Sequence, residues 1–193
     1  MTPPIVLRAS PFRPDFELPA GDLWVFGYGS LMWDPGFPHR GAMAATLYGY
    51  HRAFCIWSHH YRGTRERPGL VLGLDAGGAC RGRVFRVDTS DREAVIKYLF
   101  DREMISGVYR PKLHRVLPDG AAPVLALTFV ANRRHEQYAG KMPEREVARH
   151  IAAACGVRGP NRDYLANTCC HLDELGLADG PLHRILKLLE EMC

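Results

Sequence analysis

The sequence feature that most restricts the possible folds is a change from strand patterns to helix patterns along the chain. Before position 132, short β-rich runs bounded by turn residues predict strands at 23–28, 44–50, 52–57, 70–74, 81–87, 108–117 and 124–131. After it, helical signals predict segments at 143–155, 161–175 and 181–192. There is no regular alternation of strands and helices, so we reject a doubly wound parallel sheet. We expect an α+β domain built on an antiparallel or mixed sheet, with a small closed β-barrel as one form of it.

Local signals place the connections between these segments. Asp75-Ala76-Gly77-Gly78 predicts a turn between two strands, and Pro118-Asp119-Gly120 predicts a hairpin. Ser90 with Glu93 matches a capping box, which predicts a helix from there to about position 104. Asn161 is expected to cap the second C-terminal helix. The runs 44–50 and 52–57 are either continuous or joined by a tight bend. Pro111 is expected at an edge or a bulge of its strand.

Length and composition favour one domain in a reducing compartment. We expect residues 1–22 to form an irregular leader and residues 23–193 a single domain. The leader is proline-rich and lacks the apolar region of a signal peptide, and no run reaches the roughly 18 apolar residues of a membrane span. The six cysteines form no CxxC pair. These features predict a cytoplasmic protein without disulfides and without a membrane partner.

The charge pattern favours a small acidic ligand over nucleic acid. The formal net charge is only +4, and the basic residues are dispersed, with the densest cluster at Arg62, Arg65 and Arg67. Nucleic-acid binding usually needs a stronger basic stripe. His59-His60 and Cys169-Cys170-His171 raise the question of a metal, but adjacent ligands rarely fit one tetrahedral site. We therefore expect no metal and no nucleic-acid partner.

The end of the first strand has the composition of an anion-binding turn. Trp24-Val25-Phe26 runs into Gly27-Tyr28-Gly29-Ser30, after which apolar residues resume. Two glycines without a Cβ allow a tight turn and a close approach to a ligand. Main-chain N–H groups freed at such a turn bind carboxylates and other anions.

A carboxylate on the apolar face of the central helix is a second candidate feature. Ile96 and Leu99 define a stripe whose next position is Glu103. A carboxylate at a buried position is paired, protonated or functional, and burial raises its pKa toward the range useful to a general base. The alternative interpretation is a structural ion pair of Glu103 with Arg102 or Arg110.

Both features occur in segments that resemble one known family. The run 25–33 (Val-Phe-Gly-Tyr-Gly-Ser-Leu-Met-Trp) is similar to the opening signature of the ChaC-like γ-glutamylcyclotransferases, and the run 98–103 followed by Val108-Tyr109-Arg110 resembles the segment with their catalytic glutamate. Arg62-Gly63-Thr64 with Pro68-Gly69 resembles a substrate-side loop, although Arg65 stands where a proline is expected. The run 161–165 (Asn-Arg-Asp-Tyr-Leu) resembles a C-terminal helix motif.

The resemblance implies a closed barrel of about six strands with surrounding helices. It implies cleavage of a γ-glutamyl bond, typically that of glutathione, to 5-oxoproline and cysteinylglycine. It also implies that Glu103 is the base and that the segment Tyr28, Gly29, Ser30 and Leu31 holds the glutamyl group.

Individual side chains are also candidates for substrate contacts. Tyr109 follows the glutamate segment, and Tyr164 reaches the site from its helix or packs in the core. Arg62 or Arg65 binds the distal carboxylate of the substrate or is a solvated charge of a basic loop. Ser30 is expected to bind substrate and not to act as a nucleophile, since the chain has no GxSxG motif around it.

The chemistry of such a reaction needs few protein groups and no cofactor. The α-amine of the substrate attacks its own γ-carbonyl, so a bound conformer and one carboxylate to carry a proton suffice. Two alternatives stay open: a cyclotransferase for other γ-glutamyl amino acids or amines, and a non-catalytic regulatory module that binds an acidic metabolite.

Overall fold

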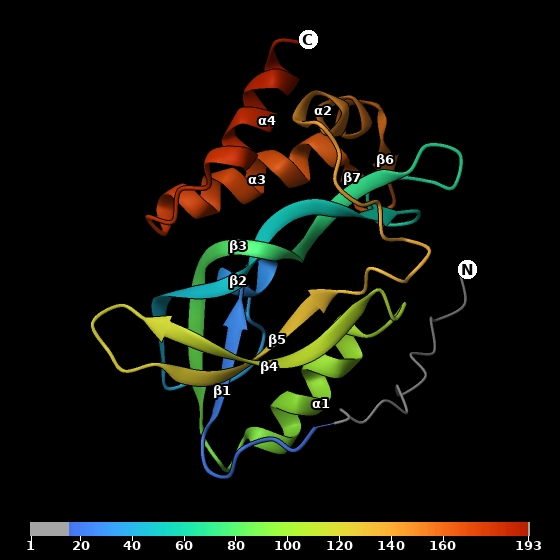
Figure 1. Ribbon diagram of the computed structural model, residues 1–193. Coiled ribbons are helices and arrows are strands. Elements are labelled where there is room, and N and C mark those ends of the chain that lie inside the picture. The colour runs from blue at the N-terminus through green and yellow to red at the C-terminus, as the bar shows by residue number, and fades with distance from the viewer. Residues whose placement is uncertain (1–15, 193) are drawn as a thin grey trace.

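The computed structural model describes residues 16–192, which are built around a closed β-barrel (Figure 1). Its five strands are β1 (Leu23–Gly27), β2 (Gly41–Ser58), β3 (Gly69–Val87), β4 (Tyr109–Pro118) and β5 (Val124–Ala131). They follow the order β1-β3-β2-β4-β5. All neighbours are antiparallel except β5 and β1, whose parallel pairing closes the barrel. The predicted α+β fold with a closed mixed barrel is therefore confirmed, with five strands in the barrel where about six were expected.

Two long strands replace four of the predicted short ones. Strand β2 is continuous through both of its predicted runs, and β3 runs through the turn expected at positions 75–78. That turn prediction is wrong because Gly77 and Gly78, with φ of +101° and +73°, form an irregularity opposite Gly49 where the register shifts. Such a bulge bends a strand pair without ending it. The bent β2–β3 pair thereby reaches both the barrel and the helices beside it (Figure 1).

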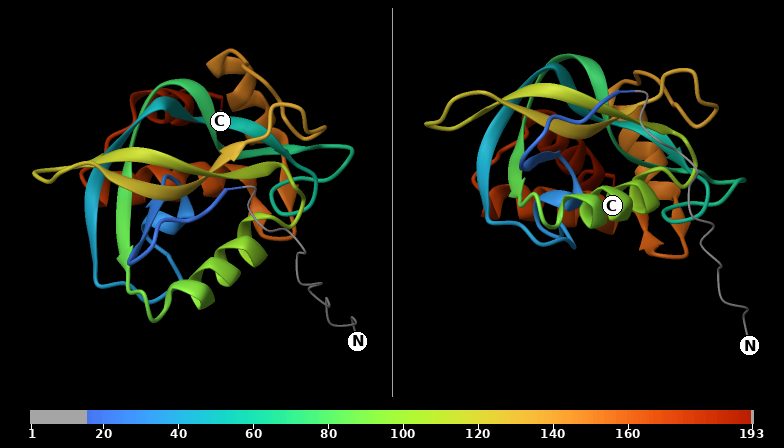
Figure 2. Two further views of the ribbon diagram at one scale, coloured as in Figure 1. Left: turned by 60° about the horizontal axis from the view of Figure 1, so that its bottom comes forward. Right: turned by 90° about the horizontal axis from the view of Figure 1, so that it is seen from below.

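Helix α1 (Arg92–Glu103) covers one side of the barrel. Its buried Val95, Leu99 and Phe100 pack against residues of β1, β3 and β5. The predicted capping box is wrong: Asp91 is the N-cap, and among residues 16–192 no side chain bonds the free N–H groups there. In the right view of Figure 2, α1 lies in front of the barrel.

The three C-terminal helices form a layer on the other side of the barrel (Figures 1 and 2). They are α2 (Glu144–Ala153), α3 (Asn161–Glu174) and α4 (Gly180–Glu190), close to their predicted bounds. Their apolar faces pack on β2 and β3 in the larger core cluster. A short ladder of β6 (Cys155–Gly156) and β7 (Gly159–Pro160), which the sequence did not suggest, connects α2 to α3.

The remaining predictions concern single segments. Residues 1–15 of the expected leader lie outside the described residues, and residues 16–22 are irregular, with Phe16 and Leu18 packed against the core beside α1. Pro111 pairs with Phe129, whereas β4 meets β2 only near its other end, so Pro111 lies on an edge portion as expected. Among the helices of residues 16–192, none is long and apolar enough to cross a membrane.

Candidate active site

Strand β1 leads directly into a one-turn 3₁₀ helix, η1 (Ser30–Met32), which the sequence did not predict. The turn is tight at Gly27, where an added Cβ would lie 3.0 Å from the Leu31 Cβ. Gly29 is different, because a Cβ there would meet only the Leu72 side chain, at 3.9 Å. At Gly27 the missing Cβ therefore allows a close approach to another part of the same chain. At Gly29 the missing Cβ leaves space open.

The start of η1 presents unused hydrogen-bond donors. Within residues 16–192, the N–H groups of Gly29, Ser30 and Leu31 donate to no other atom. The next N–H groups, those of Met32 and Trp33, bond back to the carbonyls of Gly29 and Ser30. Consecutive free N–H groups of this kind form a site for an anionic oxygen. We call the segment Tyr28–Leu31 the cradle.

A cavity of about 60 Å³ lies against the cradle. Its lining combines the turn after β1 with η1, β3, α1, β4, β5 and α3, in the residues Tyr28, Gly29, Ser30, Leu31, Leu72, Glu103, Tyr109, Phe129 and Tyr164. The structure therefore brings together every predicted site residue except Arg62. The sequence reasoning missed Leu72 and Phe129, because an apolar residue of a strand carries no signal that distinguishes a cavity wall from the core.

Glu103 is the one carboxylate among the residues that line this cavity. Its side chain is only 18% exposed. Burial raises the pKa of Glu103, and the positive charge of Arg102 opposes this effect. The Arg102 Nε lies 3.4 Å from Oε1, so the ion pair weighed as an alternative is present as well. A buried carboxyl with a raised pKa has the properties of a general base.

Arg102 joins the glutamate to the cradle, a role that the sequence did not reveal. Its Nη2 donates to the Ser30 hydroxyl at 2.9 Å, and its Nη1 donates to the Asp34 carbonyl at 3.0 Å and the Tyr98 hydroxyl at 2.8 Å. A guanidinium suits this task because its donors form a rigid planar fork. The last turn of α1 and η1 are thereby held in one arrangement.

Three tyrosines form much of the remaining wall. Burial raises the pKa values of Tyr28 and Tyr109 well above their ordinary value, and that of Tyr164 to about 12. Each hydroxyl therefore keeps its proton as a potential donor. The Tyr109 hydroxyl donates to the Leu72 carbonyl at 2.6 Å, which fixes its ring across the cavity.

Asn161 positions Tyr164 and is not the helix cap that the sequence suggested. Its buried side chain donates to the Leu70 carbonyl at 2.8 Å and accepts from the Leu70 N–H at 2.7 Å. The cap position belongs to Pro160, without a side-chain bond. The first turn of α3 is thus fixed to β3, and Tyr164, three residues later, lies on the same side of the helix.

Arg62 lies beside the cavity wall and not in the cavity. Its Nη1 donates to the carbonyls of Arg158 at 2.7 Å and Pro160 at 3.2 Å. The guanidinium carbon is 5.3 Å from the centre of the Tyr164 ring. Its contact with the substrate stays a prediction, because Arg62 is not among the residues that line the cavity.

The loop around Arg65 closes without the expected proline. The Thr64 N–H donates to the Arg67 carbonyl at 3.0 Å, and the Thr64 hydroxyl accepts from the Arg67 N–H at 3.1 Å. Arg65 is exposed at the tip of this turn. An added Cβ at Gly63 would come within 2.1 Å of the Gly69 nitrogen, so the two glycines let the ends of the loop meet.

The two motifs considered as metal ligands do not line this cavity. His171 stacks on Trp33, with ring centres 4.6 Å apart, and Cys169 is buried in α3. Over the described range, no three His, Cys, Asp or Glu side chains are grouped in a way that would hold a metal ion.

The whole barrel and helical layer match one protein family. Residues 23–192 fit the family described as ChaC-like protein. The chain belongs to the ChaC-like family. The family expected from the resemblance of its motifs is thus confirmed.

Curated γ-glutamylcyclotransferases are similar over most of the chain. A glutathione-specific γ-glutamylcyclotransferase of Escherichia coli is 38% identical over 183 residues, which cover 93% of this chain and 78% of that protein. Glutathione-specific γ-glutamylcyclotransferase 1 of Homo sapiens is 35% identical, over 79% of this chain and 72% of its own. The crystal structure of a glutathione-specific cyclotransferase from yeast has a TM-score of 0.79 at 22% identity and covers 89% of this chain and 96% of its own, which shows the same fold.

Proposed function

We propose that this protein cleaves glutathione at its γ-glutamyl bond and releases 5-oxoproline and cysteinylglycine. The proposal rests on one observation: a single cavity is lined by the free N–H groups of the cradle and also by a buried carboxylate with a raised pKa. The names of the ChaC-like relatives support the choice of glutathione as substrate.

The cradle is proposed to bind the α-carboxylate of the glutamyl group. The N–H groups of Gly29, Ser30 and Leu31 supply donors for its oxygens. The cavity is small, so the glutamyl chain is held bent, with its α-amine near its own γ-carbonyl carbon. A substrate held in this conformer need not sample its other conformations before it reacts, and this supplies much of the rate acceleration.

Glu103 is proposed to carry the proton of the reaction. The α-ammonium gives a proton to the carboxylate, and the free amine attacks the γ-carbonyl carbon. A new C–N bond closes the five-membered ring, the bond to the cysteine nitrogen breaks, and one extra proton is left on the ring nitrogen. Glu103 gives its proton to the departing nitrogen and also passes on the extra proton from the ring nitrogen. Cysteinylglycine thus leaves with an ammonium group, and the enzyme ends in its starting state. The neutral hydroxyls of Tyr28 and Tyr164 are available to bind the carbonyl oxygen, whereas that of Tyr109 already donates to the Leu72 carbonyl.

The distal part of the substrate, its cysteinylglycine portion, is proposed to extend out of the cavity past Tyr164. Arg62 stacks against this ring from the outer side and is a candidate contact for the distal carboxylate. We place the protein in the cytoplasm, which fits the free thiols of Cys55, Cys80, Cys155, Cys169 and Cys170.

A substrate comparison tests the proposed function. The purified protein is incubated with glutathione and, separately, with several γ-glutamyl dipeptides, and 5-oxoproline is measured by mass spectrometry. We expect 5-oxoproline and cysteinylglycine from glutathione. Product from the dipeptides alone would select the other γ-glutamyl compounds as substrates. No product from any of them would leave the regulatory, metabolite-binding module as the function.

A further inference from the structure

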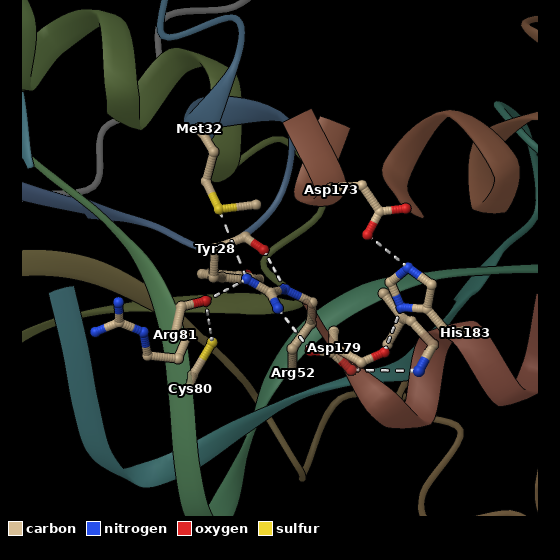
Figure 3. A network of polar contacts seen from close by, with 9 residues as sticks. Tyr28, Met32, Arg52, Cys80, Arg81, Asp173, Asp179 and His183 are labelled. Atoms are coloured by element: carbon tan, nitrogen blue, oxygen red, sulfur yellow. Dashed lines mark hydrogen bonds and ion pairs between the residues drawn. The ribbon is translucent and has the colours of Figure 1, made fainter. Parts of the chain in front are cut away.

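Arg52 of β2 is buried behind the cradle and holds three elements together (Figure 3). Its side chain is only 1% exposed. The Nε donates to the Tyr28 carbonyl at 2.5 Å, and Nη2 donates to the Arg81 carbonyl at 2.6 Å. The Nη1 donates at 2.6 Å to Asp179, which precedes α4. Nη2 also contacts the Met32 Sδ of η1 at 3.6 Å. Arg52 does not line the small cavity, and it bonds the cradle at the Tyr28 carbonyl.

The contact with Tyr28 sets the direction of the first cradle donor. The peptide bond between Tyr28 and Gly29 is trans, so its carbonyl and its N–H point in opposite directions. Arg52 binds that carbonyl from the protein side. The Gly29 N–H therefore points away from Arg52, and Gly29 lines the cavity. Rotation of this peptide plane would turn the donor out of the site.

We infer that Arg52 is a positioning residue, which orients the Tyr28–Gly29 peptide so that the cradle binds the carboxylate of the substrate. The inference rests on the proposed function for the nature of that ligand. No other side chain of residues 16–192 bonds the Tyr28 carbonyl. Without Arg52, a buried carbonyl would lose a charged donor, and the peptide would be free to rotate.

Asp179 holds the Arg52 guanidinium in place. Its Oδ2 pairs with Arg52, while its Oδ1 accepts from the Leu182 N–H at 3.2 Å as the N-cap of α4. His183 bonds the Asp179 carbonyl at 2.7 Å and Asp173 at 2.9 Å, so the start of α4 is itself held (Figure 3). The ion pair of Arg52 and Asp179 thereby connects the helical layer to the side chain that bonds the cradle.

A double substitution separates positioning from stability. Removing one member of a buried ion pair is strongly destabilising, whereas removing both charges often is not. We therefore choose Arg52→Met with Asp179→Asn, since an asparagine still caps a helix. A cavity of about 420 Å³ adjoins both positions, so water can reach the polar groups that remain. The matched control is Glu144→Gln with Arg184→Met, which removes an exposed ion pair between α2 and α4.

The kinetic readout is the KM for glutathione and the pH dependence of kcat. For the Arg52→Met/Asp179→Asn protein we expect KM to rise about 10-fold to 100-fold, the effect of losing a charge-assisted bond. The acid limb of kcat should stay in place, because Glu103 keeps its neighbours. The control pair should leave KM within about twofold of the wild type. A folded Arg52→Met/Asp179→Asn protein with unchanged KM would overturn the inference.

A second readout does not depend on the reaction. In ¹⁵N-labelled protein we expect the amide resonances of Gly29, Ser30 and Leu31 to shift in the Arg52→Met/Asp179→Asn variant but not in the control pair. Unchanged resonances would overturn the inference even if the protein is active. If the wild type releases no 5-oxoproline, the proposed function fails, and the resonances alone then decide whether Arg52 positions the cradle.

Discussion

Arg102 shows how a single side chain determines both the geometry and the charge of the site. It bonds the Ser30 hydroxyl of the cradle and lies 3.4 Å from the Glu103 carboxylate. Its positive charge favours the ionised form of Glu103, against the effect of burial. A substitution of Arg102 should therefore change the pH dependence of the reaction.

We predict that Arg102→Met shifts the acid limb of kcat/KM to higher pH. Loss of the guanidinium removes the charge that lowers the pKa of Glu103, so the carboxylate forms only at a higher pH. Loss of the bond to Ser30 should also lower kcat/KM by about tenfold. Arg102→Lys keeps the charge and serves as the control, with a smaller shift. An acid limb at the wild-type pH in Arg102→Met would show that Glu103 is not the titrating group.

At the scale of elements, the first turn of α3 is attached to β3 by one amide. Asn161 satisfies both the N–H and the carbonyl of Leu70, and this attachment lies beside the cavity residues Leu72 and Tyr164. Two buried backbone groups depend on this side chain, which makes it costly to remove.

We predict that Asn161→Ala lowers the free energy of unfolding by about 2–4 kcal/mol. Asn161→Asp should also destabilise the protein, because it keeps the acceptor for the Leu70 N–H but places a carboxylate oxygen against the Leu70 carbonyl. Urea unfolding with a common m value measures both changes. Gln137→Ala is the control, since its half-buried amide donates to the Trp57 carbonyl at 3.0 Å, and its loss should cost about 1 kcal/mol or less. Equal losses for Asn161→Ala and Gln137→Ala would contradict this role.

The same amide shows what the sequence could and could not predict. The helix after position 160 follows from its residues, and a polar residue at its start favours a cap. The contact of Asn161 with Leu70 joins positions 91 residues apart, and no local pattern contains it. Gly77-Gly78 is similar, because a turn signal becomes a bulge only when the facing strand continues past it. The cradle and Glu103 were predictable, since a strand-end turn and an apolar helix stripe are local.

In the molecule as a whole, the closed barrel and its helices bring six elements and the turn after β1 to one cavity. The burial that suits Glu103 to its proposed chemistry also costs stability. Burial of Glu103 favours the protonated form in the folded state. The folded pKa is therefore above the unfolded one. The stabilising contribution of this group is present below the unfolded pKa and is lost as pH rises through the folded pKa.

We predict that Glu103→Gln is more stable than the wild type at neutral pH. A neutral amide avoids the cost of a buried carboxylate, so the gain in Tm should appear as pH rises and disappear in acid. Thermal unfolding over a pH series measures it. The control Asp101→Asn, on the same helix and paired with Lys97 at the surface, should show no such gain. An equal Tm difference at every pH would contradict the raised pKa.

The role of Glu103 as the base is tested most directly by the rate at which Glu103→Gln releases 5-oxoproline from glutathione. We predict a folded protein whose rate is lower by about 100-fold or more, since it lacks the base that deprotonates the amine. Asp101→Asn should retain the wild-type rate within about twofold. A folded Glu103→Gln protein that turns over glutathione at the wild-type rate would show that Glu103 is not the base.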